Sequence, residues 1–326
     1  MILVTGGAGF IGSALVWGLN QKGRDDIVVT DHFGLGDKWK NLARRHIDYA
    51  VPLDQFRSWL DTNSRDIEAV FHLGACSATT ERDADYLMHN NVLFTKDLWD
   101  YCAARNIPFL YASSAATYGA EEEVFSDRHE HIPSLVPINK YGFSKHMFDA
   151  WALKQTSAPP AWFGFKFFNV YGPQEYHKGA QASVVYHAFP QVRDKGQLRL
   201  FKSYRDGIDH GEQRRDFVYV KDIVRIMLHF WTNAKSIPSG IYNLGTGEAR
   251  SFKDLGTAVF DAMGKDPKFE WIEMPESLRG QYQYFTEASL EKLRSVAGYT
   301  ADFHSLEVGV NDYVRNYLME NQPYLS

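Results

Sequence analysis

A glycine-rich turn near the start of the chain constrains the fold more than any other stretch. The apolar run MILVT is followed at once by GGAGFIG, and a helical pattern continues over residues 11–22. Gly7, Gly9 and Gly12 match G-x-G-x-x-G, and Gly6, Gly9 and Gly12 also match G-x-x-G-x-x-G. Glycine lets the backbone turn tightly and approach a pyrophosphate, while the first turn of the helix offers free N–H groups. This strand–turn–helix context predicts a dinucleotide-binding βαβ unit; a tight turn without a ligand is the alternative.

A carboxylate ends the second predicted strand. DDIVVTD finishes at Asp31, nineteen residues past Gly12, where an acidic side chain can bind the ribose of an adenosine. Taken alone, Asp31 favours NAD, because a carboxylate repels the 2′-phosphate of NADP. Lys38, in the following loop GLGDKWKN, could offset that repulsion. The sequence therefore leaves the choice between NAD and NADP open.

Buried strands and helices alternate through the first half of the chain. Residues 67–74 and the stretch IPFLYASS, which ends at Ser113 and Ser114, are predicted strands, and a predicted helix runs between them from about Asp85 to Arg105. WFGFKFFNVYG, RDFVYVKDIVRIMLHFW and SGIYNLGTG continue the alternation. Near-continuously apolar strands that alternate with helices predict an α/β fold with a Rossmann-type, doubly wound parallel sheet covered on both faces.

The remainder of the chain is less regular. Residues 173–215 are rich in polar and aromatic residues and show few periodic segments, and the C-terminal part alternates short elements such as KFEWIEM and a helix from about Thr286 to Val296. We expect two interleaved domains, an NAD(P)-binding Rossmann domain and a smaller α/β substrate-binding domain. The first comprises residues 1–170 and 216–248, and the second comprises residues 171–215 and 249–326.

Composition narrows the class of partner. The chain has 326 residues and a formal net charge of −5, which gives no reason to expect nucleic acid or an anionic membrane as a partner. No apolar run reaches membrane-spanning length, and no targeting segment is expected before the first strand. Cys76 and Cys102 form no disulfide framework and suit a reducing, cytoplasmic setting. His129 and His131 flank Glu130, but nothing nearby completes a metal site, so no metal is expected.

The stretch YGFSK places a phenol and an ammonium four residues apart at the start of a predicted helix. Tyr141 and Lys145 would share one helical face. A cation beside a phenol favours the phenolate and would lower the pKa of Tyr141 from its usual value near ~10. Tyr141 would then accept a proton near neutral pH. An ordinary surface pair on an amphipathic helix is the alternative.

In combination, these residues resemble an extended short-chain dehydrogenase/reductase that acts on a nucleotide sugar. TGGAGFIG, FHLGA, YASSAATYG, YGFSK, FFNVYGP, RDFVYVKD and NLGTG occur in the family's order and cover nearly the whole chain. The resemblance implies a catalytic set of Ser114, Tyr141 and Lys145. Ser114 would hydrogen-bond the reacting oxygen and Tyr141 would exchange the proton. Lys145 would hold the ribose of the cofactor and lower the tyrosine pKa, helped by the positive charge of oxidised nicotinamide.

A closer resemblance points to a branch of the NAD-dependent epimerase/dehydratase family that inverts C6 of an ADP-linked heptose. GACSATTE, ASSAATYG, HKGAQASV and RGQYQYFTEASL look like that branch. It implies interconversion of ADP-D-glycero-β-D-manno-heptose and ADP-L-glycero-β-D-manno-heptose through transient oxidation to a ketone by bound NADP, in the supply of heptose for lipopolysaccharide core. Rotation at C6 moves the ketone oxygen, so a second proton donor beside Tyr141 is useful. The resemblance implies Lys178 for this second acid/base group.

The same resemblance implies two sets of binding residues. The cofactor would contact Gly6, Gly9, Phe10, Ile11, Gly12, Asp31, His32, Lys38, Leu73, Gly74, Ala75, Cys76, Ser77, Asn90, Lys145, Val170 and Lys178. The substrate would contact Ser114, Asn169, Ala180, His187, Phe201, Lys202, Ser203, Tyr204, Arg215 and Tyr282. The planar fork of Arg215 suits a diphosphate, with a salt bridge to Asp216 or Asp222 as the alternative. Leu53 stands where this branch implies a basic side chain, and Ala180 where it implies a hydroxyl.

Other functions are weighed against this expectation. A sugar-nucleotide 4,6-dehydratase would need an acid and a base where this chain has Ala115 and Ala116, which exchange no proton. A UDP-hexose 4-epimerase needs the same Ser114, Tyr141 and Lys145 and stays open as an alternative. A non-catalytic dinucleotide-binding sensor is the alternative from a different class, although ligand binding alone does not need the phenol. The resemblance also implies a homo-oligomer, most simply a pentamer.

Overall fold

A seven-stranded sheet forms the centre of the computed structural model, which describes residues 1–63, 67–120, 125–279 and 282–326. The strand order is β10-β6-β5-β4-β1-β2-β3, and every neighbouring pair is parallel. The strands are β1 (Ile2–Thr5), β2 (Ile27–Asp31), β3 (Tyr49–Pro52), β4 (Ala69–His72), β5 (Phe109–Ser114), β6 (Trp162–Phe167) and β10 (Gly240–Leu244). The predicted doubly wound parallel sheet is confirmed, because the strand order runs outward in both directions from β1 and β4.

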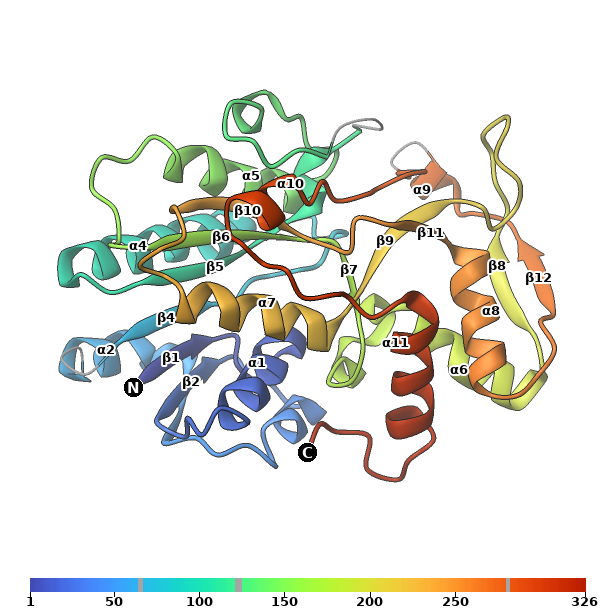
Figure 1. Cartoon of the computed structure of the whole chain (residues 1–326), viewed down its shortest axis with the longest axis horizontal. Coiled ribbons are helices and arrows are strands. Elements are labelled where there is room, and N and C mark those ends of the chain that lie inside the picture. Colours follow the sequence, from blue (N-terminus) through green and yellow to red (C-terminus); the bar gives the residue numbers. More distant parts are fainter. Residues whose placement is uncertain (64–66, 121–124, 280–281) are drawn as a thin grey trace.

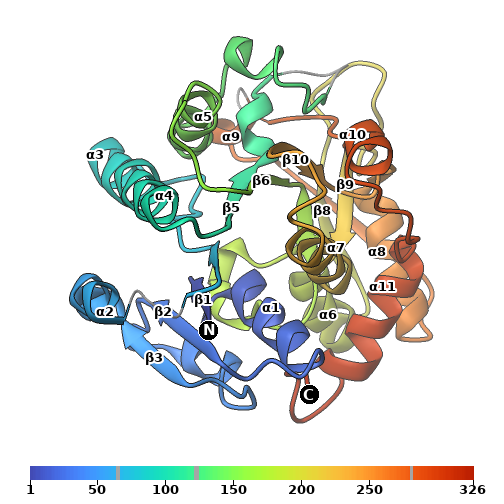
Figure 2. The same cartoon turned by 60° about the vertical axis from the view of Figure 1, so that its left-hand side comes forward.

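Helices cover both faces of this sheet (Figure 1, Figure 2). α1 and α7 pack side by side on one face, and α2, α4 and α5 cover the other. Their bounds are α1 (Phe10–Asn20), α2 (Phe56–Asn63), α4 (Phe94–Arg105), α5 (Lys140–Ala152) and α7 (Val220–Thr232). Within β1, Ile2 and Val4 enter the core beside α1 and α7, whereas Leu3 enters the core on the opposite face. Because side chains alternate between two buried faces, these strands are apolar throughout.

A smaller α/β part adjoins the carboxyl end of β6. β7 follows β6 after a single residue, pairs in parallel with β9, and shares a three-stranded sheet with β11; β8 and β12 form a separate parallel pair. Its elements are β7 (Asn169–Tyr171), α6 (Val184–Lys195), β8 (Leu198–Phe201), β9 (Arg214–Tyr219), β11 (Ala249–Ser251), α8 (Phe252–Ala262), β12 (Phe269–Ile272), α9 (Glu276–Arg279) and α11 (Leu306–Tyr313), whereas α10 (Glu291–Ser295) packs against β10 of the main sheet. Figure 1 shows α6, α8 and α11 gathered on the right around these short strands.

Several short helical turns carry residues of interest. These are η1 (Asp37–Asn41), η2 (Leu53–Gln55), η5 (Ala115–Tyr118), η6 (Ile132–Ser134) and η7 (Tyr176–Gln181), all 3-10, and η4 (Met88–Leu93) and η8 (Val314–Leu318), both π-helical. α3 (Ala84–Leu87) leads through η4 into α4, so the predicted helix from Asp85 to Arg105 contains a π-helical stretch. η7 lies beyond β7 and η1 lies beyond β2.

Three elements differ from the sequence-based expectation. The predicted helix from Thr286 to Val296 is wrong except for α10, since the residues before Glu291 are not helical. α6 forms where the sequence analysis predicts no helix. Ser183 caps it and its buried residues Val185, Ala188, Phe189 and Val192 share one face, but the polar residues between them and Pro190 conceal this pattern in the sequence. β3 was also missed, because this edge strand buries only one of its four side chains and therefore lacks an apolar run.

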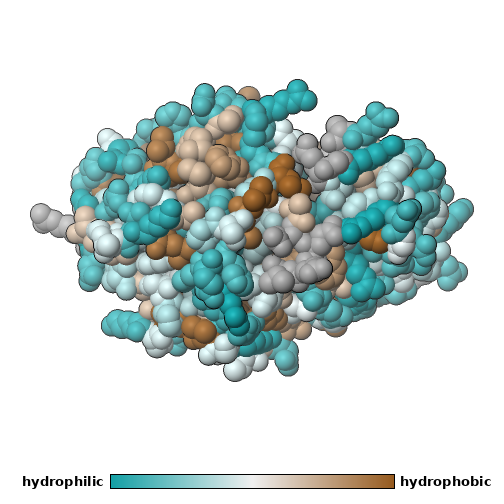
Figure 3. Space-filling model, turned by 90° about the horizontal axis from the view of Figure 1, so that it is seen from above, coloured by the Kyte–Doolittle hydropathy of each residue, from teal (hydrophilic) through white to brown (hydrophobic). Residues whose placement is uncertain are grey.

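The described residues contain no helix long and apolar enough to cross a bilayer, and no cluster of three or more His, Cys, Asp or Glu side chains arranged for a metal ion. Both cysteines are free thiols, and that of Cys102 is buried. Figure 3 shows the face seen from above, where hydrophilic residues predominate and hydrophobic residues form small separate groups.

Candidate active site

The glycine turn lies between β1 and α1, where two backbone segments approach closely. Gly6 has a φ of +66°, and a Cβ at this position would lie 2.5 Å from the backbone N of Gly74, which follows β4. A Cβ on Gly12 would lie 2.2 Å from the carbonyl oxygen of Gly6. Gly9 is the N-cap of α1, and no side chain caps this helix end. The free N–H groups of the first turn are therefore available to a pyrophosphate.

Asp31 ends β2, and donors of the chain itself engage both of its carboxylate oxygens. Oδ2 accepts a hydrogen bond from the backbone N of Ala8 at 2.9 Å. Oδ1 accepts from the backbone N of His32 at 2.7 Å and from Nζ of Lys38 at 2.5 Å. Asp31 is 7% exposed, whereas the Lys38 side chain is 24% exposed. The ammonium of Lys38 thus neutralises the carboxylate and stays accessible from solvent.

Hydrogen bonds join the loop after β4, residues 73–77, to η4 and through it to α5. Cys76 exchanges two hydrogen bonds with Asn91, from its N to Oδ1 at 2.9 Å and from Nδ2 to its O at 3.0 Å. Nδ2 of Asn91 also donates to Oγ of Ser144 in α5 at 3.0 Å. Asn90, the predicted cofactor contact, donates to Oδ1 of Asn91 at 3.1 Å. Sequence analysis missed Asn91, whose only signal was its place beside Asn90.

The structure brings the three predicted catalytic residues together. Ser114 is the last residue of β5, and its Oγ accepts a hydrogen bond from the backbone N of Ala116 at 3.1 Å. Tyr141 and Lys145 lie in α5 and are 9% and 5% exposed. A Cβ on Gly142 would lie 2.5 Å from the carbonyl oxygen of Ala116. The glycine after Tyr141 therefore lets α5 approach the turn after Ser114, and the two hydroxyls form a hydrogen bond.

Burial controls the protonation of this set. Burial raises the pKa of Tyr141, and the hydrogen bond with Ser114 lowers it by a smaller amount. Burial also lowers the pKa of Lys145 to about 8, although the carboxylate of Asp149 acts in the opposite direction. Nζ of Lys145 donates to the carbonyl oxygen of Ala112 at 2.8 Å. The sequence analysis predicts from the spacing of Tyr141 and Lys145 that the pKa of Tyr141 is lowered. This prediction is wrong for the chain alone, in which the pKa of Tyr141 is raised.

A buried ion pair, which sequence analysis did not predict, fixes the helix that carries this set. Asp149 in α5 accepts hydrogen bonds from Nζ of Lys166 at 2.8 Å, Oγ of Ser113 at 2.6 Å and the hydroxyl of Tyr111 at 2.9 Å. Nζ of Lys166 also donates to Oγ1 of Thr117 at 2.5 Å. Both side chains of the pair are 0% exposed. The pair therefore joins α5 to β5, β6 and η5.

Lys178 lies in η7, against the start of α1. Its Nζ is 5.2 Å from the ring centroid of Phe10, and Phe10 is the first residue of α1. Burial lowers the pKa of Lys178, and the carboxylate of Glu175 acts in the opposite direction. Ala180, two residues further on, is exposed. Lys178 is thus held beside the glycine turn as an amine that gives up its proton more readily than a free lysine.

Arg215 is a buried cation in β9. It is 8% exposed, and burial lowers its pKa. Its guanidinium donates to two backbone carbonyls and lies 5.1 Å from the ring centroid of Tyr282. Among the described residues no carboxylate pairs with it: Asp216 accepts from backbone N–H groups, and Asp222 pairs with Arg225. The alternative of a salt bridge to Asp216 or Asp222 is therefore wrong.

The other predicted substrate residues occupy several elements. At the end of β8, Lys202 donates to Glu273 at 2.6 Å, and the guanidinium of Arg279 lies 3.9 Å from the ring centroid of Tyr204. Phe201 and Ser203 beside them are half-buried, as are Val170 in β7 and His187 in α6; Asn169 is exposed at the start of β7.

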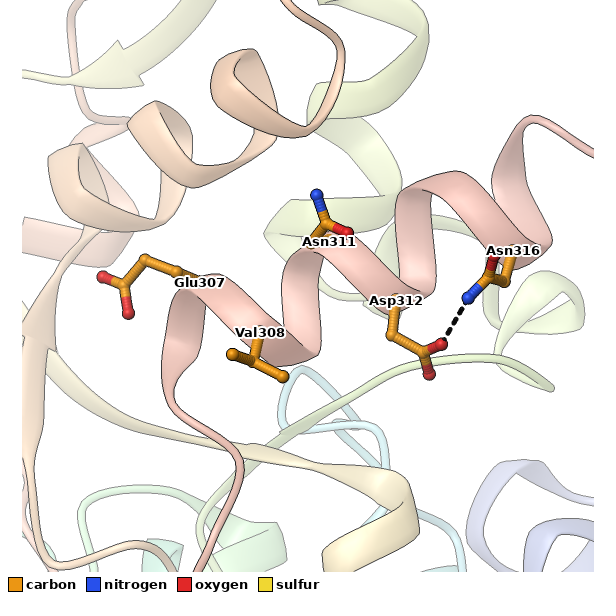
Figure 4. A pocket seen from close by; sticks show the side chains of 5 residues that line it. All are labelled: Glu307, Val308, Asn311, Asp312 and Asn316. Carbon is orange, nitrogen blue, oxygen red and sulfur yellow. Dashed lines mark hydrogen bonds between the residues drawn. The ribbon is translucent and has the colours of Figure 1, made fainter.

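A hollow of about 340 Å³ elsewhere contains none of these residues. Figure 4 shows that it lies on α11 and the turn after it, lined by Glu307, Val308, Asn311, Asp312 and Asn316. Glu307 pairs with Arg250 and Asp312 pairs with Lys221, each at 2.7 Å. Because these carboxylates are already paired, the hollow offers no free charge and is not a candidate active site.

Comparisons with known proteins identify the family of the chain. A family profile described as the NAD dependent epimerase/dehydratase family matches residues 2–245. A relative from Fusobacterium nucleatum named ADP-L-glycero-D-manno-heptose-6-epimerase is 53% identical over 335 residues, which cover 100% of each chain. The crystal structure of the Helicobacter pylori protein of the same name has a TM-score of 0.79 at 28% identity and covers 97% of this chain and 95% of that one.

A second solved structure extends the likeness to a complex. MoeE5, determined with UDP-glucuronic acid and NAD, has a TM-score of 0.75 at 26% identity and covers 97% of this chain and 99% of that one. The profile match spans the glycine turn, the catalytic set and β10, and the Fusobacterium relative spans the complete chain. This chain therefore belongs to the NAD dependent epimerase/dehydratase family.

Proposed function

We propose that this chain interconverts ADP-D-glycero-β-D-manno-heptose and ADP-L-glycero-β-D-manno-heptose by inverting C6. The full-length, 53% identity to a relative named for that reaction carries the proposal. The half-buried Ser114 and the buried Tyr141 and Lys145 support an enzymatic rather than a sensing function, because binding alone does not need a hydrogen-bonded phenol. The product would supply heptose for lipopolysaccharide core.

Residues of the first βαβ unit fit a nicotinamide dinucleotide, and we propose NADP. The space at Gly6 and Gly12, which a Cβ would fill, and the uncapped start of α1 suit its pyrophosphate. The ion pair of Asp31 with Lys38 supports NADP over NAD, because a neutralised carboxylate repels a 2′-phosphate less and the ammonium attracts it. When bound, the dinucleotide accepts a hydride from the sugar and returns it.

Two groups of the chain would handle the proton at the oxygen on C6. Ser114 would hydrogen-bond that oxygen, and Tyr141 would accept its proton while the carbon becomes a ketone. Rotation about the C5–C6 bond presents the opposite face of the ketone and moves its oxygen. Lys178, whose pKa is lowered by burial, would then donate the proton to the oxygen in its second position. The reverse reaction would use the same groups in the opposite order.

The smaller α/β part would hold the nucleotide-sugar. Arg215, a buried cation that pairs with no carboxylate among the described residues, suits the diphosphate, and the ring of Tyr282 beside it restricts its movement. We therefore propose that residues 1–170 and 216–248 bind the dinucleotide and that residues 171–215 and 249–326 bind the sugar. β9 crosses this division, since it begins at Arg214 and pairs with β7 and β11.

Reaction with the two candidate sugars tests the proposed substrate. Purified protein is incubated with ADP-D-glycero-β-D-manno-heptose, and the configuration at C6 is followed by NMR. We expect conversion to a mixture of the two C6 epimers, approached from either side. No inversion at C6, together with inversion of UDP-glucose at C4 by the same preparation, would replace the proposal with a UDP-hexose 4-epimerase.

Titration with each dinucleotide tests the proposed cofactor. We expect the protein stripped of cofactor to bind NADP more tightly than NAD, and Lys38→Ala to weaken NADP binding by about 10-fold, the loss of one charge-assisted contact. Lys40→Ala is the matched control, because that nearby lysine pairs with Asp37 instead. Equal affinity of the unaltered protein for both dinucleotides would contradict the preference.

We also propose that the protein is a cytoplasmic homo-oligomer, with five copies as the specific expectation. Its free cysteines suit a reducing compartment. The exposed apolar side chains of Tyr86, Leu93, Phe143 and Met147, on α3, η4 and α5, are available to a second copy. Light scattering at micromolar concentration would give the mass, and a value equal to one chain would overturn the assembly.

A further inference from the structure

The position of Lys178 depends on contacts that lie far from it in the sequence. Lys178 belongs to η7, and its backbone N donates to the carbonyl oxygen of Glu175 at 3.0 Å. The carboxylate of Glu175 is buried and accepts from the backbone N and Oγ of Ser183, at 2.6 and 2.7 Å. These bonds attach one side of η7 to the start of α6. The other side of η7 faces the dinucleotide-binding half.

Asn41 joins this second side of η7 to the glycine turn. This residue ends η1 and is 2% exposed. Its Nδ2 lies 2.9 Å from the carbonyl oxygen of Ala8, 3.1 Å from that of Gln174 and 3.1 Å from Nδ1 of His177. Ala8 belongs to the glycine turn, and His177 is the residue before Lys178. One amide group therefore connects the turn that would cradle the pyrophosphate with the segment that carries the second acid/base group.

Gln174 makes further hydrogen bonds at this junction, although its own backbone conformation is unfavourable. Its φ of +85° is in the left-handed region, which residues other than glycine seldom adopt. Its side chain is 0% exposed, and Nε2 donates to the carbonyl oxygen of Asn41 at 2.9 Å and to Oγ of Ser13 at 3.3 Å. Oε1 accepts from the backbone N of Leu325 at 3.3 Å. A strained residue persists only where its surroundings hold it, and such residues cluster at functional sites.

We propose that Asn41, supported by Gln174, is a positioning residue for Lys178: it ties η7 to the glycine turn, so that the dinucleotide-binding half sets the place of the second proton-transfer group. This inference rests on the proposed function of Lys178. Asn41 itself need not touch the sugar, because its amide nitrogen already contacts Ala8, Gln174 and His177. A displacement of about 1 Å in a reacting group costs on the order of 10²-fold in rate.

A double-mutant cycle between Asn41→Ala and Lys178→Met tests the inference. In otherwise unaltered protein, we expect Asn41→Ala to lower kcat for C6 inversion by roughly 10- to 100-fold. In the Lys178→Met background, the same change should alter kcat by less than about twofold, because a residue that acts through Lys178 has nothing left to position. An equal fall in kcat in both backgrounds would mean a general structural contribution and would overturn the inference.

Two further variants serve as a control and as a substitute for Asn41→Ala. Asn20→Ala is the matched control: Asn20 also joins two segments of the first βαβ unit, donating to the carbonyl oxygens of Arg24 and His46 at 2.9 and 2.8 Å, and should change kcat by less than about twofold in either background. If Asn41→Ala does not fold, His177→Phe removes one polar partner of the Asn41 amide at a half-buried site and should show the same dependence on Lys178.

The outcomes separate this inference from the proposed function. A kcat for Lys178→Met equal to that of the unaltered protein would remove Lys178 from the mechanism and the inference with it. A strong loss for Lys178→Met, together with unchanged kcat for folded Asn41→Ala and His177→Phe, would keep the proposed function and reject only the positioning by Asn41. Thermal melting of each variant shows which of them are folded.

Discussion

At the scale of single residues, burial opposes both charged forms that the proposed proton transfer uses. It raises the pKa of Tyr141 and lowers that of Lys145 to about 8. Enclosure of these two side chains by the folded chain therefore favours a neutral phenol and a neutral amine. Proton transfer by Tyr141 then depends on the partners that favour its phenolate, the Ser114 hydroxyl in the chain and the positive charge of an oxidised nicotinamide.

Removing the phenolic hydroxyl alone tests this dependence. Tyr141→Phe should keep the bound dinucleotide and lose about 10²–10⁴-fold in turnover, the usual contribution of a general acid or base. Absorbance of the bound nicotinamide and the rate of C6 inversion measure the two properties. Tyr49→Phe is the control, because Tyr49 is 63% exposed on β3. Turnover of Tyr141→Phe within about twofold of the unaltered rate would contradict the acid/base function of the phenol.

The buried ammonium of Lys145 should make the chain less stable near neutral pH. Its pKa falls from 10.5 to about 8 on folding, so the unfolded chain binds more protons between these values. The cost is complete below pH 8, roughly 3 kcal/mol at 1.36 kcal/mol per unit, and disappears as the pH rises to 10.5. The hydrogen bond to Ala112 offsets about 1 kcal/mol of this.

Lys145→Met should therefore unfold with a free energy roughly 2 kcal/mol higher than that of the unaltered chain at pH 7, while turnover is lost. Urea unfolding of both chains, stripped of dinucleotide, measures the difference. The difference should shrink as the pH is raised from 8 to 10. Lys140→Met, at an exposed position of the same helix, should change the free energy little at either pH. A lower stability of Lys145→Met at pH 7 would refute this account.

At the scale of elements, one fully buried ion pair orients the helix that carries the catalytic set. Asp149 and Lys166 join α5 to β6, and the second bond of Lys166 reaches Thr117 in the turn after Ser114. Removing one member of a buried pair leaves an uncompensated charge and typically costs 3–5 kcal/mol, whereas an exposed pair contributes about 0–1 kcal/mol.

Lys166→Met should therefore lower the free energy of unfolding by roughly 3–5 kcal/mol. The double variant Asp149→Asn, Lys166→Met should recover part of that loss, since no charge stays buried. Arg193→Met, which breaks the exposed pair with Asp194, should change the free energy of unfolding little, because solvent screens exposed charges. Urea unfolding at pH 7 gives all three values, and a cost for Lys166→Met as small as that for Arg193→Met would contradict the buried charge.

The elements differ in how well the sequence predicts them. Apart from the edge strand β3, the strands of the seven-stranded sheet are buried on both faces, so their continuous apolar runs identify them without tertiary information. β3 has only Val51 buried. It is stabilised as a strand by its pairing with β2 rather than by an apolar run of its own. α6 keeps its apolar face at Val185, Ala188 and Val192, but polar residues and Pro190 conceal the period. The formation of β3 and α6 therefore depends on contacts with neighbouring elements more than on a pattern in their own residues.

At the scale of the whole molecule, a single apolar core runs from the main sheet into the smaller part. It contains residues of β1, α1 and α7 together with residues of α6, α8 and α11. Leu325 belongs to it, is 0% exposed, and its carbonyl oxygen accepts from Arg45 in the first βαβ unit. Because no polar boundary divides this core, we expect both parts to unfold in one transition.

Leu325→Ala tests this continuity. The change should lower the free energy of unfolding by about 2–5 kcal/mol, as for other buried leucines, without splitting the transition or changing its denaturant slope. Circular dichroism and tryptophan fluorescence followed in the same urea titration should coincide. Met319→Ala, at a position that is 58% exposed, is the control. Two separated transitions in the unaltered chain would show that the parts unfold independently.

Long separations along the chain also explain which site residues the sequence could predict. The glycine turn and the Tyr141–Lys145 pair are local patterns. The structure places the turn between β1 and α1 and the pair in α5, as the adjacent sequence predicts. Asn41 meets Gln174 across 133 positions, so no local pattern marks either residue. The pKa of Tyr141 could not be predicted either, because it depends on how deeply the folded chain encloses the phenol rather than on which residue is four positions away.

The bond between Arg45 and Leu325 links residues 280 positions apart, and this has a consequence for synthesis on the ribosome. At 5–20 residues per second, the first βαβ unit emerges roughly 15–60 s before the leucine that completes it. During that interval Gln174 also lacks its partner at Leu325, so the segment carrying Lys178 can settle only after translation has passed this point. The nascent protein would therefore assemble its dinucleotide cradle early and become competent for catalysis last.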